Sequence, residues 1–262
     1  MTARRGVRFA ALGYLALLLI VPVGLVVYRT FQPGVGAVWD SITTPAAISA
    51  FWLTLEIAAI SVVLNPVLGV HTALLLVRGR FRGKWLIEAL LDLPFAVSPV
   101  VVGLSLVLVY GRGGWLADLP FQVIFALPGM VLATVFVSLP FVAREVIPVL
   151  CEVGDEQEQA AATLAAGGWT TFRRITFPAI RWGLAYGIVL SVARAIGEFG
   201  AVSVVSGRVA GETMTLTLLV QQRFENFDLA GAYAASTLLA VIALLTLLVM
   251  TRINPRREEH DS

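Results

Sequence analysis

Six stretches of roughly 20 residues with almost no charge constrain the fold of this chain more than any other feature. A helix needs about 20 apolar residues to cross a hydrocarbon core of about 30 Å. Within hydrocarbon, only helices and closed barrels satisfy every backbone polar group. The sequence therefore predicts an all-α integral membrane protein with six transmembrane helices. The expected spans are 9–27, 53–77, 86–110, 121–143, 184–206 and 229–251.

Composition supports the same class. The chain is 58% hydrophobic and 14% charged, whereas a soluble domain is about 45–50% apolar and about 25% charged. Too few charges remain to cover a soluble surface, and disordered chains are poor in apolar residues. A net charge of +2 argues against nucleic acid as a partner. The lone Cys151 excludes an internal disulfide and a cysteine-based zinc cluster, so no metal site is expected.

The distribution of basic residues predicts the orientation. Of the 19 Lys and Arg residues, 14 lie on the side of the N-terminus, four lie on the opposite side, and Arg194 lies within a span. Cytoplasmic loops carry an excess of Lys and Arg. Both termini are therefore expected in the cytoplasm. The long cytoplasmic loop, residues 143–183, lies between the fourth and fifth spans.

This loop begins with signals for a helix outside the bilayer. Asp155 is expected to cap the first free amides, and Glu158 to reach back and complete a capping box. An alanine-rich run follows, and Gly167 with Gly168 is expected to end a helix of about three turns.

An alanine face lets another surface approach closely and loses little side-chain entropy on docking. The segment 169–177 after it mixes bulky apolar residues with Arg173 and Arg174, and Pro178 is expected to end it. Two interpretations stay open from the residues alone. The segment is either a contact for a cytoplasmic partner or an amphipathic helix lying on anionic lipid.

The segment resembles the cytoplasmic EAA loop of permeases in ABC importers. That pattern is Glu-Ala-Ala, a Gly four positions after the second Ala, and Ile-x-Leu-Pro after nine more residues. The matching positions in this chain are Gln159, Ala160, Ala161, Ala165, Ile175, Phe177 and Pro178. The spacing matches in full, but Gln159 replaces Glu, Ala165 replaces Gly and Phe177 replaces Leu. The first change removes a charge that could pair with an ATPase, and the second is expected to make the turn less sharp.

A narrower resemblance runs from about residue 50 to the end. The segments 93–101, 168–182, 193–207 and 211–216 are similar to the W-type permease of sulfate/thiosulfate importers, and permeases for molybdate and tungstate share much of this pattern. The resemblance implies one ABC-transporter transmembrane domain over residues 1–262 in the bacterial cytoplasmic (inner) membrane. It also implies a translocation pathway shared with a second homologous permease of T or U type.

The further implied partners are a dimer of cytoplasmic ATPase subunits bound at the coupling loop, and a periplasmic or lipid-anchored anion-binding protein. The chain has no Gly-rich phosphate loop of the Walker type. We therefore expect no enzyme activity and no cofactor in this chain, with ATP bound by the partner subunit.

Two ionisable residues lie within the fifth expected span. Arg194 and Glu198 are four residues apart and so share one helix face. Charges inside a membrane usually face a bundle interior or an aqueous cavity. Arg194 either helps a divalent oxyanion to cross, or forms a structural salt bridge. Gly197 and Gly200 beside them permit close helix approach or form a hinge. Near the third span, Glu88 and Asp92 are expected to pair with Arg82 and Lys84.

Other classes of protein fit less well. An intramembrane serine protease would need Ser206 near His71, but these residues are expected near opposite ends of their spans. A stand-alone channel or secondary carrier needs no long docking loop, and carriers often contain an inverted repeat that this sequence does not show.

Overall fold

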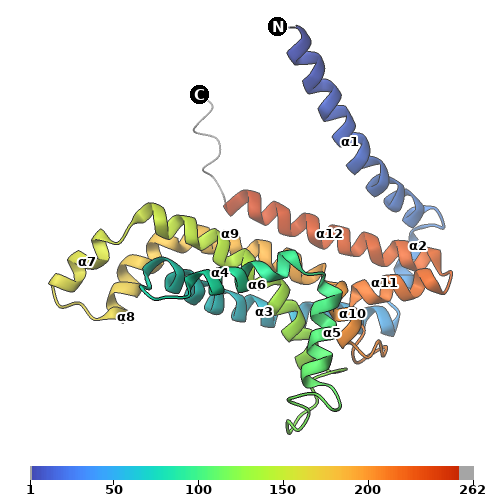
Figure 1. Cartoon of the computed structure of the whole chain (residues 1–262). Coiled ribbons are helices and arrows are strands. Elements are labelled where there is room, and N and C mark those ends of the chain that lie inside the picture. Colours follow the sequence, from blue (N-terminus) through green and yellow to red (C-terminus); the bar gives the residue numbers. More distant parts are fainter. Residues whose placement is uncertain (1, 254–262) are drawn as a thin grey trace.

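The computed structural model describes residues 2–253, and over that range its regular elements are helices (Figure 1). In chain order they are α1 (Thr2–Phe31), α2 (Val35–Ile42), α3 (Pro45–Arg78), α4 (Lys84–Ala96), α5 (Pro99–Tyr110), α6 (Leu127–Val153), α7 (Glu156–Thr163), α8 (Gly168–Thr171), the π-helical turn η1 (Phe172–Thr176), α9 (Phe177–Ile196), α10 (Gly200–Val205), α11 (Leu216–Glu225) and α12 (Leu229–Ile253). Arg256 and Arg257, two of the basic residues used to predict orientation, lie outside the described residues.

Within the described chain, five helical stretches are long and apolar enough to cross a membrane. They lie in α1, α3, α6, the continuous stretch from α8 to α9, and α12. The third expected span, 86–110, is two helices. The chain bends by 114° between α4 and α5, and the two helices count as a sixth span only if the bent pair is taken together.

The prolines around the break between α4 and α5 explain it. Val97 and Ser98 are extended, with ψ of 138° and 134°, and Pro99 begins α5. A residue before proline is disfavoured in the helical region, so a continuous helix over 86–110 is not formed. The fifth expected span, 184–206, is also interrupted. α9 ends at Ile196, and the separate helix α10 begins at Gly200.

The fourth expected span differs from the structure at both ends. α6 begins at Leu127 rather than near 121 and continues to Val153, ten residues beyond the expected end. Pro128 in the first turn has no intrahelical partner to lose there, and Gly154, with φ of 68°, ends the helix. The first part of the segment expected as a loop, up to Val153, is therefore an extension of α6.

α3, α6 and α9 run side by side and form the centre of the fold (Figure 1). Glycines bring them close together. A Cβ added at Gly69 of α3 would lie 2.8 Å from Val142 Cβ in α6, and one added at Gly187 of α9 would lie 2.9 Å from Val142 Cα. The three helices therefore touch backbone to backbone near Val142.

A buried polar cluster also joins these helices. Asn65 of α3 donates from Nδ2 to Ser138 of α6 and to Ser191 of α9, both at 2.7 Å. All three residues are buried. In an apolar environment such bonds hold helices in register.

α1 projects away from this bundle and contacts it at its C-terminal end (Figure 1). There Thr30 bonds to the backbone oxygen of Tyr233 at 2.9 Å and to the hydroxyl of Thr237 at 2.7 Å, both in α12. Over residues 13–31 only 6% of the helix is buried. The apolar surface of α1 is thus left for surroundings other than this chain.

Candidate functional site

The segment that resembles a coupling loop folds into α7, α8 and η1, which lie at one end of the central bundle (Figure 1). Asp155 occupies the N-cap position of α7, but its side chain makes no capping hydrogen bond. The expected capping box is therefore absent, because Glu158 is turned away toward α3 and η1. α7 is also shorter than expected, since it ends at Thr163 rather than at the glycine pair.

The turn after α7 keeps the left-handed geometry for which glycine is usually required. Ala165 has φ of 55°. The Ala166 amide donates to Ala161 O at 3.1 Å, and the Ala165 amide donates to Ala162 O at 3.0 Å. This is the Schellman pattern that closes many helices. The sequence predicted a less sharp turn with alanine at this position, and that prediction is wrong. Ala165 adopts the left-handed conformation at a conformational cost.

Two polar contacts attach α7 to the membrane helices. Glu158 Oε2 lies 2.8 Å from Nε of Arg78 at the end of α3. Its other oxygen accepts a hydrogen bond of 2.8 Å from the hydroxyl of Thr176, the last residue of η1. Nothing in the spacing of 155–178 had indicated this role, because Arg78 is 80 residues away in the sequence.

The accessible surface of this segment combines large apolar side chains with the exposed Arg173 and Arg174. The side chains of Leu164 and Trp169 are 84% and 73% exposed. Trp169 stacks on Phe172 with centroids 5.8 Å apart, and Phe172 contacts the half-exposed Phe177. Gln159 and Ala160 are also exposed, while Ala161 and Ile175 are half-buried.

Pro178 does not end the segment. It lies in the first turn of α9, and the helix runs on from α8 through the π turn as one stretch, Gly168–Ile196, that is long and apolar enough to cross a membrane. A proline there costs little, because the first turn of a helix has unpaired amides. The apolar strip 169–177 is thus continuous with the helix that carries Arg194.

At the other end of α9 the expected ion pair is present. Arg194 Nη1 lies 2.6 Å from Glu198 Oε2. That oxygen accepts no aligned N–H, so the contact is an ion pair rather than a directed hydrogen bond. The Glu198 side chain is 1% exposed and that of Arg194 is 30% exposed. Glu198 Oε1 also accepts from the Ala201 amide at 2.8 Å, and so caps α10.

The two glycines near this pair have different surroundings. Gly200 begins α10 and packs on α5, because a Cβ there would lie 2.9 Å from Pro99 Cβ. Gly197 follows α9 and is exposed. Gly200 therefore permits close approach of two short helices, and Gly197 lies in the bend between α9 and α10.

Arg194, the more exposed partner of the ion pair, borders a cavity of about 440 Å³. Arg194 lines it together with Val137 and Phe141 of α6 and with residues 94–99 at the break between α4 and α5. A cavity of this size accommodates a small solvated ion. The break between α4 and α5 and the side chain of Arg194 therefore line the same cavity, although they are far apart in the sequence.

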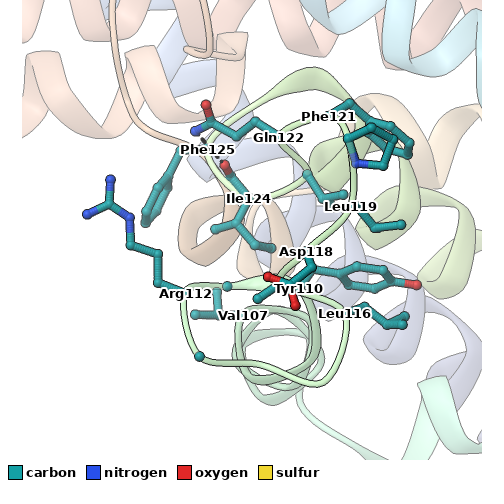
Figure 2. A pocket seen from close by; sticks show the side chains of 15 residues that line it. Val107, Tyr110, Arg112, Leu116, Asp118, Leu119, Phe121, Gln122, Ile124 and Phe125 are labelled. Atoms are coloured by element: carbon teal, nitrogen blue, oxygen red, sulfur yellow. Dashed lines mark hydrogen bonds between the residues drawn. The ribbon is translucent and has the colours of Figure 1, made fainter.

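A larger cavity of about 810 Å³ lies beyond the end of α5 (Figure 2). The loop 111–126 folds around it, and Tyr110, Arg112, Asp118 and Gln122 line it. The Phe125 amide fastens the loop to α10 through Val205 O at 2.8 Å. Sequence reasoning had placed the fourth span over part of this loop and so missed the cavity.

Comparison with known proteins decides the family. The family of binding-protein-dependent transport system inner membrane components matches residues 65–259. The sulfate transport system permease protein CysW of Synechocystis sp. is 48% identical over 96% of this chain and 93% of its own length. CysW of Escherichia coli K12 is 44% identical over 94% of this chain and 86% of its own length. The chain belongs to this family of transport permeases.

Two further proteins are similar to this chain, one in sequence and one in structure. The T-type sulfate permease CysT of Escherichia coli K12 is 37% identical over 93% of this chain and 89% of its own length. In structure, the chain resembles a bacterial alginate ABC transporter crystallised with an alginate-bound periplasmic protein. The TM-score is 0.79 at 16% identity, and the match covers 97% and 94% of the two chains. That likeness concerns the fold.

Two further expectations from the sequence concern the separation of Ser206 from His71 and the partner of Asp92. Ser206 bonds to Thr213 O, while His71 bonds within α3 to Val67 O at 2.7 Å, so the residues of a protease pair do not meet. Asp92 pairs with Arg144 of α6 rather than with the basic residues near the start of α4. The extension of α6 explains this change, because it carries Arg144 alongside α4.

Proposed function

We propose that the chain is the W-type permease subunit of an ATP-driven importer of sulfate, and that thiosulfate follows the same route. The observation that carries this is the identity of 44–48% with CysW proteins over nearly the whole chain. The match to CysT is lower, at 37%. This order favours the W position beside a second permease of T type.

The cytoplasmic partner is proposed to be a dimer of ATPase subunits that docks on the coupling loop, residues 143–183 of a single permease domain. Support comes from the exposed Leu164 and Trp169, because large apolar side chains exposed outside a membrane usually mark an interaction surface. The alanine face of α7 allows close approach. Both termini are proposed to lie in the cytoplasm, on the same side as α7.

The transport pathway is proposed to pass the cavity beside Arg194. A guanidinium offers five N–H donors, and the ion pair with Glu198 occupies one side of it. The remaining donors suit the oxygens of a tetrahedral dianion. Glu198 offsets part of the charge, so the anion is held weakly and leaves readily. Gly197 and Gly200 are proposed to let the bend beside this site move.

A periplasmic or lipid-anchored protein is proposed to deliver the anion on the outer face. The related alginate transporter was crystallised with such a periplasmic protein. The resemblance to permeases with this partner supports the assignment. The chain itself is proposed to hold no cofactor, with ATP bound in the ATPase subunits.

Uptake of labelled sulfate tests the function. In cells that lack other sulfate importers, the chain with its partners should restore uptake, and excess unlabelled molybdate or tungstate should compete poorly. Strong competition by molybdate would instead assign the chain to a molybdate importer. Absence of uptake with the complex intact in the membrane would reject an import role.

A docking variant tests the partner. Ala161→Arg places a long cation on the half-buried face of α7, so the ATPase should no longer co-purify and uptake should be lost. Ala162→Ser keeps a small side chain on α7 and should retain both properties. Normal co-purification with Ala161→Arg would favour a helix that lies on lipid.

A further inference from the structure

Arg78 joins the ends of three helices. It is the last residue of α3, and its Nη1 and Nη2 donate to the backbone oxygens of Leu150 and Gly154 at 3.3 and 2.5 Å. These carbonyls belong to the end of α6, where no amide of the same helix is available and the helix dipole is negative. The same guanidinium pairs through Nε with Glu158 of α7 at 2.8 Å.

Glu158 extends this connection to a fourth element. Its second oxygen accepts the hydroxyl of Thr176 at 2.8 Å, and Thr176 is the buried residue directly before α9. The Arg78 and Glu158 side chains are 22% and 21% exposed. The pair is thus partly removed from water, and its geometry is more firmly held than that of a fully exposed pair.

Packing alone does not fix α7. It contains eight residues and none of them is buried. Its mean position therefore depends on the turns at either end and on the polar contacts of Glu158. Removing those contacts should leave α7 free to move relative to the bundle.

The helices on the other side of the connection form one unit. Gly69 and Gly187 bring α3 and α9 against α6, and Asn65 bonds to both α6 and α9. α9 begins beside Thr176 and carries Arg194 in its last turn. A displacement applied at Arg78 and Thr176 therefore acts on α3, α6 and α9 together, and reaches the arginine of the cavity.

We infer that Arg78, Glu158 and Thr176 are positioning residues that transmit movement of α7 to the α3–α6–α9 bundle. This rests on the proposed docking of an ATPase at α7. The ATPase moves α7 during its cycle, and the three contacts convert that movement into a movement of the membrane helices. Without them α7 moves alone, so ATP is hydrolysed with little transport.

Conservative variants in the full transporter test this role. The complex of this chain, the second permease, the ATPase and the binding protein is purified and reconstituted into vesicles. Labelled sulfate uptake and ATP hydrolysis are measured on the same preparation. Thr176→Val removes the hydroxyl at nearly constant shape, and Glu158→Gln removes the charge. Both should lower the sulfate transported per ATP severalfold while the ATPase co-purifies normally.

Two matched variants serve as controls, and a third variant, Arg78→Lys, extends the test to the arginine. Thr176→Ser keeps the hydroxyl and should restore the wild-type ratio. Glu88→Gln removes an exposed carboxylate from α4, outside the coupling loop, and should leave the ratio unchanged. Arg78→Lys keeps the charge but not the fork that reaches three acceptors. It should lower the ratio.

The outcomes separate this inference from the proposed function. A wild-type ratio in both Thr176→Val and Glu158→Gln would overturn it. Loss of ATPase binding in those two variants would also overturn it, because the residues would then act in assembly. Failure of the wild-type complex to bind the ATPase or to import sulfate would instead reject the proposed function.

Discussion

The guanidinium of Arg194 lies against the carboxylate of Glu198, with Nη1 2.6 Å from Oε2. The two partners are not equivalent. Glu198 is enclosed and also caps α10, whereas Arg194 is partly open to a cavity. Glu198 therefore depends on Arg194 for a counter-charge, while Arg194 keeps donors free for another ligand. This asymmetry makes the structural role and the transport role of the arginine separable.

Arg194→Gln should destabilise the complex by about 2 kcal/mol. Breaking a fully buried ion pair costs about 3–5 kcal/mol, and the partial exposure of Arg194 reduces this value. The double variant Arg194→Gln with Glu198→Gln should recover most of the loss, because no uncompensated carboxylate remains. Thermal unfolding of the purified complex measures this difference.

Sulfate uptake by the same double variant then shows whether the charge of Arg194 acts in transport. If Arg194 acts on the anion, stability recovers while sulfate uptake stays low. Recovery of both stability and uptake would make the ion pair purely structural and would remove Arg194 from the pathway.

Ala165→Gly should stabilise the turn after α7. A left-handed conformation costs an L-residue about 1–2 kcal/mol, and glycine avoids this cost. Part of the gain is offset by the greater freedom of glycine in the unfolded chain. Hydrogen exchange at Ala165 and Ala166, whose amides close the turn, should slow by about fivefold for a net gain of about 1 kcal/mol.

Ala162→Gly provides the matched comparison. Ala162 lies within α7, so glycine there should speed local exchange by removing helix propensity of about 1 kcal/mol. Equal effects of the two substitutions would mean that φ at residue 165 is not left-handed in solution.

Much of this architecture follows from the sequence because hydrophobic length is a local property. The approximate spans in α3, α6, α9 and α12 are recognisable from apolar runs of sufficient length. The breaks are harder to place. Pro99 marks the one between α4 and α5, but a proline is also tolerated within a membrane helix, as Pro66 is within α3.

The ion pairs of the candidate sites also differ in how far the sequence predicts them. The pairing of Arg194 with Glu198 could be predicted from their spacing of four residues, and it forms although α9 ends at Ile196 and Glu198 lies in the bend before α10. The pairing of Glu158 with Arg78 could not, because it depends on how α3 and α6 end in space. The capping-box pattern predicted that Glu158 would reach back to the start of α7, whereas its carboxylate binds Arg78 and Thr176.

Asn65→Leu should weaken the contact between the central helices without changing the fold. Each hydrogen bond between helices in a membrane contributes about 0.6 kcal/mol on average and up to about 1.7 kcal/mol. Asn65 makes two such bonds. The substitution should therefore lower the unfolding free energy of the complex by about 1–3 kcal/mol. Thermal unfolding of Ser191→Ala, which removes one bond, should show a smaller loss.

Gly69→Ala should separate α3 from α6. The added Cβ would lie 2.8 Å from Val142 Cβ, and the helices have no room to accept it without moving apart. Overpacking of this kind costs about 1–3 kcal/mol. Because the bundle is proposed to move as a unit, sulfate uptake should fall together with the melting temperature. Gly24→Ala is the control, since a Cβ at Gly24 in α1 meets nothing within 4 Å. It should leave both quantities near the wild-type values, and an equal loss in the two variants would show that the close packing at Val142 is not what limits stability.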